Sequence, residues 1–304
     1  MSLTASQRKL GVALDAVRAR EDLKARLAAD PVEFVHRFET RDDRELAALV
    51  CASCAFGNVK AIRMKLADLF GRIAPLSLAG AADKPKELRR RLRGFVHRVY
   101  KGEDIAGLLI GARRVQRRYG SLGRAFARAL AGADATLAPD DATREALATF
   151  CDLVRKAGGF ARTKPLGPGE RRGPSHLLSD VRAGGAGKRL WLFLRWMIRP
   201  ADGVDLGLWT EDVPTNRLLV PVDVHIHKLA KNLGLTQRDD VSWRTAVEIT
   251  TGLRHLDASD PVKYDFSLCH MGMVQRCPSR RDPVRCEGCG VKPVCIRWSK
   301  QREA

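Results

Sequence analysis

The sequence predicts an all-α protein. Most segments repeat their apolar residues at the helical period, and runs that alternate apolar and polar residues between turn signals are scarce. A composition of 45% apolar and 29% charged residues is typical of a globular chain. With 304 residues the chain can form one large or two ordinary domains, either of which buries a core without disulfide bonds.

The chain is strongly basic, with 54 Lys and Arg against 35 Asp and Glu and a formal net charge of +19. This excess is spread along the sequence, which favours an extended polyanion as the partner. Nucleic acid is the first candidate for such a partner. The alternative is a basic protein from a GC-rich genome, where arginine is frequently encoded. The longest uncharged run, Leu46 to Val59, is shorter than the ~20 residues that span a membrane. The first 20 residues lack the pattern of a secretory signal, so we expect a cytoplasmic, nucleoid-associated protein.

The first strong helical segment runs from Asp42 to Ile73. Its acidic start and basic end suit the helix dipole, and it is either one long helix or two helices broken near Gly57. Within it Cys51 and Cys54 form a CxxC pair, but the surrounding Ala, Leu and Val residues indicate a buried helix. We therefore assign no metal to these two cysteines.

Two basic amphipathic helices are expected next, over 84–104 and 111–130. In the first, apolar residues recur at helical spacing from Leu88 to Val99. The second carries an arginine cluster, which is either a solvated helix face or a set of phosphate contacts. This cluster consists of Arg113, Arg114, Arg117 and Arg118.

A stretch rich in Gly, Pro and Ser, residues 157–187, indicates a long loop or a seam between two helical lobes. We accordingly divide the chain into a helical lobe with basic clusters (1–174), a central region (175–268) and a Cys-rich loop (269–304).

The central region contains a Gly-rich turn, Gly184 to Arg189, followed directly by the amphipathic helix LWLFLRWMIR. Such a turn exposes backbone N–H groups that bind phosphate at a helix start. No strand precedes it, which excludes a Rossmann or P-loop site. The alternative is a plain turn between two helices. On the helix, Lys188, Arg195 and Arg199 fall on one stripe opposite the apolar face.

A second constellation is the segment LLVPVDVHIHKLA, residues 218–230. Asp223 stands at the position of a helix N-cap, and Pro221 ends the preceding segment. On the residues alone, a purely capping role for Asp223 remains the alternative to a chemical one.

The tail contains the spacing C-x8-C-x2-C-x5-C, formed by Cys277, Cys286, Cys289 and Cys295. Four clustered cysteines among prolines and basic residues are typical of a bound metal or cluster, and reactive or buried thiols are the alternative. The donor set alone does not separate zinc from a four-iron cluster. Cys269 is interpreted as a residue of the helical core.

The C-x2-C-x5-C ending resembles the iron–sulfur loop of the endonuclease III and adenine-mismatch glycosylase branch of the helix–hairpin–helix DNA glycosylases, although the gap from Cys277 to Cys286 is two residues longer. The stretch Pro221 to Ile226 resembles the V-D-T-H segment that carries the catalytic aspartate of that branch. The layout of Lys188 and Asp223 is similar to that of archaeal 8-oxoguanine glycosylases, which place a lysine at the start of the equivalent helix.

A longer resemblance covers nearly the whole chain. The blocks DPVEFVHRF, KRLWLFLRWMIR, VDLGLW, VPVDVHIHKLAKNLGL and DPVKYDF identify the chain as resembling the uncharacterised bacterial family of domain of unknown function 2400. Together the resemblances imply a two-lobed helix–hairpin–helix glycosylase-like fold with a C-terminal cluster loop that contains four cysteines.

They also imply a function: a DNA repair glycosylase, with or without AP-lyase activity, that excises a damaged base such as an oxidised one. A non-catalytic iron–sulfur nucleic-acid-binding protein of the same fold is the alternative. The expected partner is damaged double-stranded DNA, the expected cofactor a 4Fe-4S cluster or else zinc, and the expected state a monomer that binds no membrane.

The site residues implied are catalytic Lys188 and Asp223, with Trp191, Trp196 or Trp209 contributing to a base pocket. The expected DNA contacts are Gly185, Gly187, Arg189, Arg195, His225 and Lys228, and the expected metal ligands are Cys277, Cys286, Cys289 and Cys295.

Overall fold

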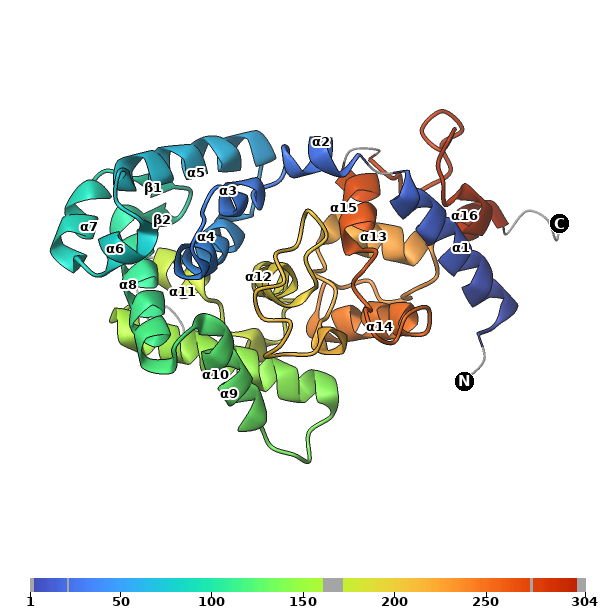
Figure 1. The fold of residues 1–304 in the computed structure, drawn as a ribbon. Coiled ribbons are helices and arrows are strands. Elements are labelled where there is room, and N and C mark those ends of the chain that lie inside the picture. The colour runs from blue at the N-terminus through green and yellow to red at the C-terminus, as the bar shows by residue number, and fades with distance from the viewer. Residues whose placement is uncertain (1–2, 21, 161–171, 274–275, 300–304) are drawn as a thin grey trace. The chain divides into compact units, whose positions relative to one another are not determined.

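A computed structural model describes residues 3–20, 22–160, 172–273 and 276–299. Within these residues all regular secondary structure is helical apart from one two-stranded antiparallel hairpin, β1 (Val96–His97) and β2 (Tyr100–Lys101), which confirms the all-α prediction. No helix in the described part of the chain is long and apolar enough to cross a membrane. Figure 1 shows the elements in chain order.

The chain folds into two compact units. The helical unit comprises Leu23–Ala183 and Leu192–Pro214, and the composite unit comprises Met1–Asp22, Gly184–Trp191 and Thr215–Ala304. The first 22 residues therefore belong with the C-terminal part of the chain and not with the segment that follows them. Composition gave no sign of this, because contacts between distant segments leave no compositional trace.

The helical unit contains most of the helices. These are α2 (Leu23–Leu27), α3 (Glu33–His36), α4 (Arg41–Cys54), α5 (Val59–Ile73), α6 (Leu78–Ala82), α7 (Pro85–Arg91), α8 (Gly102–Tyr119), α9 (Leu122–Ala131), α10 (Pro139–Gly158) and α11 (Arg172–Leu177), with the 3-10 turn η1 (Val181–Ala183). Helix α8 packs along α10, and α4 and α9 complete the core around α8 (Figure 1). Helix α12 (Lys188–Ile198) begins in the composite unit and ends in the helical unit.

The segment from Asp42 to Ile73 forms two helices. Helix α4 ends at Cys54 and α5 starts after Asn58, whose side chain accepts hydrogen bonds from the first turn of α5. Between them Gly57 adopts a positive φ of 100°, a conformation that glycine reaches without strain. Cys51 and Cys54 are both buried in α4, as the sequence indicated, and burial raises the pKa of the Cys51 thiol well above its usual value.

The prediction of a single helix over 84–104 is wrong. Helix α7 ends at Arg91, Gly94 takes a positive φ of 77°, and the chain then forms the β1–β2 hairpin. Leu88 is buried as its helical position requires, but Val99 lies in the hairpin turn with 38% of its surface exposed. Leu92 and Phe95 are also buried, so the apolar spacing continues although the helix has ended.

The arginine cluster of α8 makes contacts inside its own unit. Arg113 pairs with Asp42 at 2.5 Å and with Asp83 at 3.1 Å, and Arg117 pairs with Asp83 at 2.7 Å. Arg114 donates to the Ala157 carbonyl at 2.6 Å. These contacts favour a structural interpretation of the cluster over phosphate binding.

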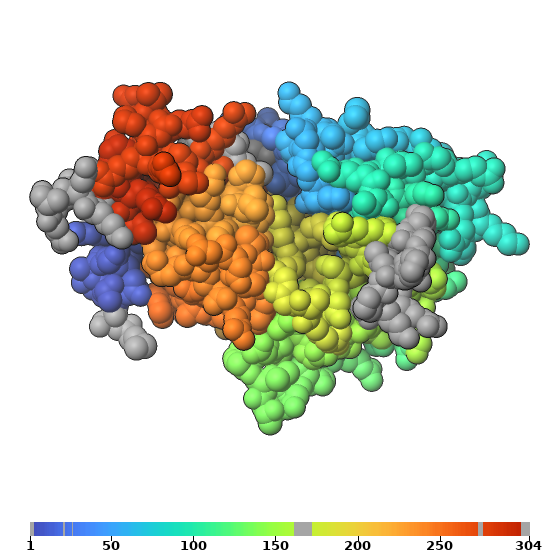
Figure 2. All heavy atoms as spheres, turned by 180° about the vertical axis from the view of Figure 1, so that it is seen from behind, coloured from blue at the N-terminus to red at the C-terminus, as the bar shows by residue number. Residues whose placement is uncertain are grey.

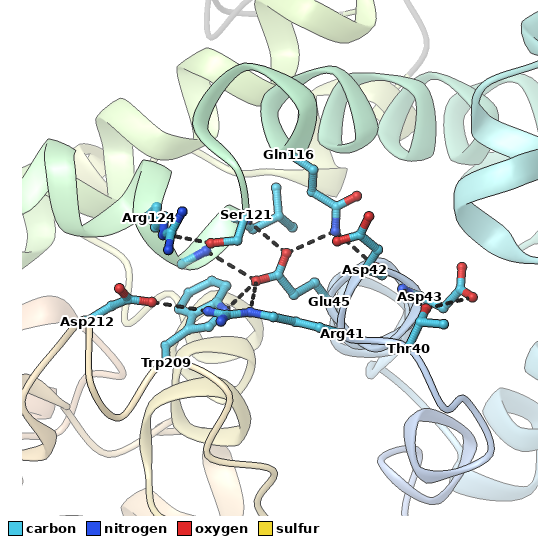
Figure 3. A network of polar contacts seen from close by, with 12 residues as sticks. Thr40, Arg41, Asp42, Asp43, Glu45, Gln116, Ser121, Arg124, Trp209 and Asp212 are labelled. Carbon is cyan, nitrogen blue, oxygen red and sulfur yellow. Dashed lines mark hydrogen bonds and ion pairs between the residues drawn. The ribbon is translucent and has the colours of Figure 1, made fainter.

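The buried carboxylate of Glu45 joins α4, α9 and the segment after α12 (Figure 3). Its two oxygens accept hydrogen bonds from Gln116 Nε2 at 2.9 Å, from Trp209 Nε1 at 2.7 Å and from the backbone N–H groups of Leu122 and Gly123 at 2.8 and 3.3 Å. The last two donors lie at the start of α9, where N–H groups have no partner inside the helix. The positive end of the α9 dipole also favours a negative charge at this position.

The composite unit holds α1 (Ala5–Ala19), the start of α12, η2 (Thr215–Arg217), α13 (Val224–Asn232), α14 (Trp243–Arg254), α15 (Asp265–Met273), η3 (Lys292–Val294) and α16 (Ile296–Ser299). Helix α13 packs on α15, and α1 contacts the tail at η3. The N-terminal helix thus lies beside the cysteine-rich tail, where blue and red segments meet in Figure 1 and Figure 2.

Candidate active site

The Gly-rich turn is fastened to the start of α14. Gly184 accepts a hydrogen bond from Trp243 N at 2.9 Å, and Gly185 forms a β-bridge with Ser242. Gly184 and Gly187 have positive φ angles of 87° and 62°, so both need the conformational freedom of glycine. The Gly187 carbonyl then accepts from Leu190 and Trp191, which begins α12 at Lys188. The turn therefore fixes where the Lys188 side chain emerges.

Lys188 and Asp223 form an ion pair across 35 residues of sequence. The distance from Lys188 Nζ to Asp223 Oδ2 is 2.5 Å, and the two side chains are 29% and 16% exposed. The two residues that the sequence analysis predicts to be catalytic are thus in direct contact, and both side chains are partly exposed.

The two oxygens of Asp223 have separate tasks. Oδ1 accepts hydrogen bonds from the backbone N–H groups of His225 and Ile226 at 2.9 and 3.0 Å, which caps α13. Oδ2 faces Lys188 Nζ. The capping and the chemical interpretations of Asp223 are therefore both compatible with the geometry, because capping occupies only one oxygen and fixes the direction of the other.

Burial and charge act in opposite directions on this pair. Burial lowers the pKa of Lys188, but the negative charge of Asp223, together with Cys269 and Asp265, outweighs it, so the pKa of Lys188 is raised. For Asp223, burial raises the pKa, but Lys188 and the two capping N–H groups bring it below its usual value. The pair is thus an ammonium and a carboxylate at neutral pH.

Helix α15 contributes two groups that sequence reasoning missed as site residues. Asp265 begins the helix and is buried, and Cys269 lies one turn later and is half-buried. Both raise the pKa of Lys188. The i, i+4 spacing of an acid and a thiol was visible in the sequence, but nothing there indicated which helix they would face.

The expected DNA contacts divide into two groups. Gly185, Gly187, Arg189, His225 and Lys228 all lie in the composite unit with Lys188 and Asp223, and none of them is buried. The stripe of Arg195 and Arg199, in contrast, is buried in the helical unit, where Arg195 pairs with Asp205 at 3.1 Å and Arg199 pairs with Asp205 at 2.9 Å and with Asp202. A phosphate contact at Arg195 is therefore not supported. Burial therefore makes Arg195 and Arg199 structural, whereas Lys188 on the same stripe is partly exposed.

The tryptophans expected at a base pocket are all in the core. Trp191, Trp196 and Trp209 have no exposed surface, Trp191 stacks on Trp243 with ring centroids 5.9 Å apart, and Trp209 donates to Glu45. The structure therefore gives these rings a packing role, and it does not present them to a ligand.

Cys277, Cys286, Cys289 and Cys295 line one recess together with Asn232 and Trp298. Burial raises the pKa of the Cys277 thiol, and the other three cysteines raise it further, although the Asn232 amide opposes them. Among the residues that the structure describes, no group of three or more Cys, His, Asp or Glu side chains is placed so that it could hold a metal ion. Four cysteines on one recess are nevertheless the donor set that a four-thiolate site requires.

The comparisons with known proteins give a family and no function. No curated protein and no solved structure matches the chain. A family profile described as "Protein of unknown function (DUF2400)" matches residues 30–274, which include Lys188 and Asp223 and end before the first of the four tail cysteines. The chain therefore belongs to the DUF2400 family.

Proposed function

We propose that the protein is a DNA glycosylase that removes a damaged base, with an associated AP-lyase step, and that it acts through Lys188 and Asp223. The observation that carries this proposal is the 2.5 Å contact between Lys188 Nζ and Asp223 Oδ2 at the start of α12. A lysine beside a carboxylate acceptor is an arrangement that supplies an amine nucleophile. The resemblance to helix–hairpin–helix glycosylases and the net charge of +19 support DNA as the substrate.

The proposed reaction balances within the pair and the substrate. Asp223 Oδ2 takes one proton from the Lys188 ammonium, and the free amine forms a bond to C1′ of the damaged nucleotide. The C1′–N bond to the base breaks with its electron pair, and the proton held by Asp223 is available to the departing base. The C1′–O4′ bond of the sugar then breaks, O4′ takes one proton from the Lys188 nitrogen, and a Schiff base forms between C1′ and Lys188. Loss of a C2′ proton from this Schiff base expels the 3′ phosphate, which cleaves the strand.

The DNA would be held by the Gly-rich turn and by neighbouring basic groups. Backbone N–H groups at the start of the 11-residue helix α12 are suited to a phosphate. Lys228 and His225 share α13 with the Asp223 cap and support the same placement. Binding through such contacts should weaken steeply with salt.

We further propose that the four tail cysteines hold a 4Fe-4S cluster, with zinc as the other metal that four thiolates accept. Such a group would contribute structure to the tail, and no step of the proposed reaction passes through it. The location of all four thiols on one recess supports this assignment.

The proposed function is tested by measuring base release from a panel of duplexes, each with one damaged or mismatched base. Release from at least one duplex, with salt-sensitive binding, would support a glycosylase. Binding to DNA without release from any duplex would instead favour a non-catalytic nucleic-acid-binding protein of the same fold.

The pH dependence of the reaction should shift when Asp223 is changed. In Asp223→Asn the charge that raises the pKa of Lys188 is lost, and burial then lowers that pKa. The amine is freed at lower pH, so the acidic limb of the rate profile should move to lower pH. The maximal rate should fall about 10²- to 10⁴-fold, because the proton acceptor is missing. Single-turnover rates measured across the pH range check both effects, and an unmoved acidic limb would contradict the assigned coupling.

Removal of the metal should loosen the composite unit. Cys289→Ser is expected to lose most of its metal and to lower the melting temperature by roughly 5 °C or more, since a bound group that requires the folded state stabilises it. Cys269→Ser is the control, because Cys269 does not line the recess, and it should keep the metal content of the wild type. Metal analysis and thermal unfolding of both variants provide the measurement. Equal metal content in the two variants would refute the ligand assignment.

A further inference from the structure

Asn232 is the last residue of α13 and only 2% of its surface is exposed. Its side chain makes three polar contacts. Nδ2 lies 3.3 Å from Cys277 Sγ and 3.0 Å from the Pro278 carbonyl oxygen, and Oδ1 lies 3.1 Å from Arg297 Nε. A buried amide whose donors and acceptor are all used is a fixed element of the structure.

The partners determine which way the amide faces. Arg297 Nε can only donate a hydrogen bond, and the Pro278 carbonyl can only accept one. The oxygen of Asn232 must therefore face Arg297, and its NH₂ group must face Pro278 and Cys277. A flipped amide would lose two of the three contacts, so the N–H donor points at the sulfur in the only arrangement that satisfies the surroundings.

This contact lies at the recess shared by the four cysteines. Asn232, Leu229 and Leu233 line it from α13 and the residue that follows this helix. Both leucines are buried, and the Asn232 amide is the polar group that α13 presents to the recess. An N–H···S bond in a dry environment withdraws electron density from a thiolate and fixes the orientation of its side chain.

We propose that Asn232 is a positioning residue for Cys277, and that its N–H group holds the sulfur ready for the metal and stabilises it once the metal is bound. This inference rests on the proposed four-cysteine metal site. Helix α13 would then contribute to both sites. Asp223 caps its first turn, and Asn232 at its last position would position the metal ligand Cys277.

The test compares two substitutions of Asn232 in the full-length, metal-loaded protein. Asn232→Asp keeps the size of the side chain and an acceptor for Arg297, but its carboxylate has no N–H to donate. Asn232→Leu removes all polar contacts. Lys231→Gln is the matched control, because Lys231 is the preceding residue of the same helix, pairs with the exposed Asp239 and does not line the recess.

The measurement is metal retention against increasing concentrations of a chelator, with the visible absorption spectrum and circular dichroism recorded on each variant. We expect the chelator concentration that removes half of the metal to fall about 10- to 100-fold in both Asn232 variants and to stay unchanged in Lys231→Gln. If the metal is a cluster, its reduction potential should also fall in Asn232→Asp, because the sulfur has lost a hydrogen bond.

Several results would overturn the inference. If both variants, or Asn232→Asp alone, retained the metal as well as the wild type does, Asn232 would have a packing role and would not position the Cys277 sulfur. Purified wild-type protein that binds neither iron nor zinc would overturn the metal site together with this role. Base release by that metal-free protein would leave the glycosylase proposal standing, so the two failures can be told apart.

Discussion

Replacing Lys188 with alanine is expected to abolish covalent trapping of the protein on damaged DNA by borohydride. The reason is that Lys188 supplies the only amine paired with Asp223 among the contacts that the structure describes, and no Schiff base forms without it. DNA binding should persist, since Arg189, Lys228 and the Gly-rich turn remain. Trapping and filter binding on the same duplex measure the two properties side by side.

Lys188→Arg is the sharper variant of this experiment. Arginine keeps the positive charge and the ion pair with Asp223, but its guanidinium stays protonated and cannot act as the nucleophile. It should therefore bind DNA as the wild type does and give no adduct. Lys231→Gln should trap normally. An adduct in either Lys188 variant would contradict the assignment of the nucleophile.

Replacing Glu45 with leucine is expected to destabilise the helical unit by about 3–5 kcal/mol, the usual effect of removing one member of a buried charged network. Four donors would lose their acceptor at once, including Trp209 Nε1 and two N–H groups at the start of α9 (Figure 3). Against a typical total of about 5–15 kcal/mol this loss is a large share. Urea unfolding, followed by helical circular dichroism and tryptophan fluorescence, measures it.

The control for Glu45 is Glu87→Leu. Glu87 also accepts from arginines, Arg90 and Arg91, and they lower its pKa to about 2, but the pair lies at the surface. Exposed pairs contribute little, so the unfolding midpoint should hardly move. If Glu45→Leu and Glu87→Leu shifted the unfolding midpoint equally, the buried network of Glu45 would contribute no more to stability than the surface pairs of Glu87.

Much of the helical architecture could be predicted from the sequence, because local signals determine it. The break at Gly57, the acidic first turn of α4 and the buried CxxC all follow from residues within a few positions of one another. The hairpin after α7 was missed for the complementary reason: its apolar residues fit a helical spacing, and the deciding feature is the turn at Gly94.

The parts that could not be predicted depend on contacts between distant segments. Arg195 looks like a surface residue on a helical wheel. Only the fold shows that its guanidinium is buried in an ion pair with Asp205. The pairing of Glu45 with Trp209 spans 164 residues and leaves no local pattern. Lys188 and Asp223 were anticipated only through a resemblance, since the spacing of 35 residues carries no signal by itself.

The central claim is that Lys188 attacks the sugar of a damaged nucleotide, and peptide mapping tests it most directly. The protein is reduced with borohydride on the duplex from which it releases a base, digested and examined by mass spectrometry. We predict a single modified peptide with the nucleotide adduct on the Nζ of Lys188. Base release with an adduct on another residue, or with none, would contradict the claim.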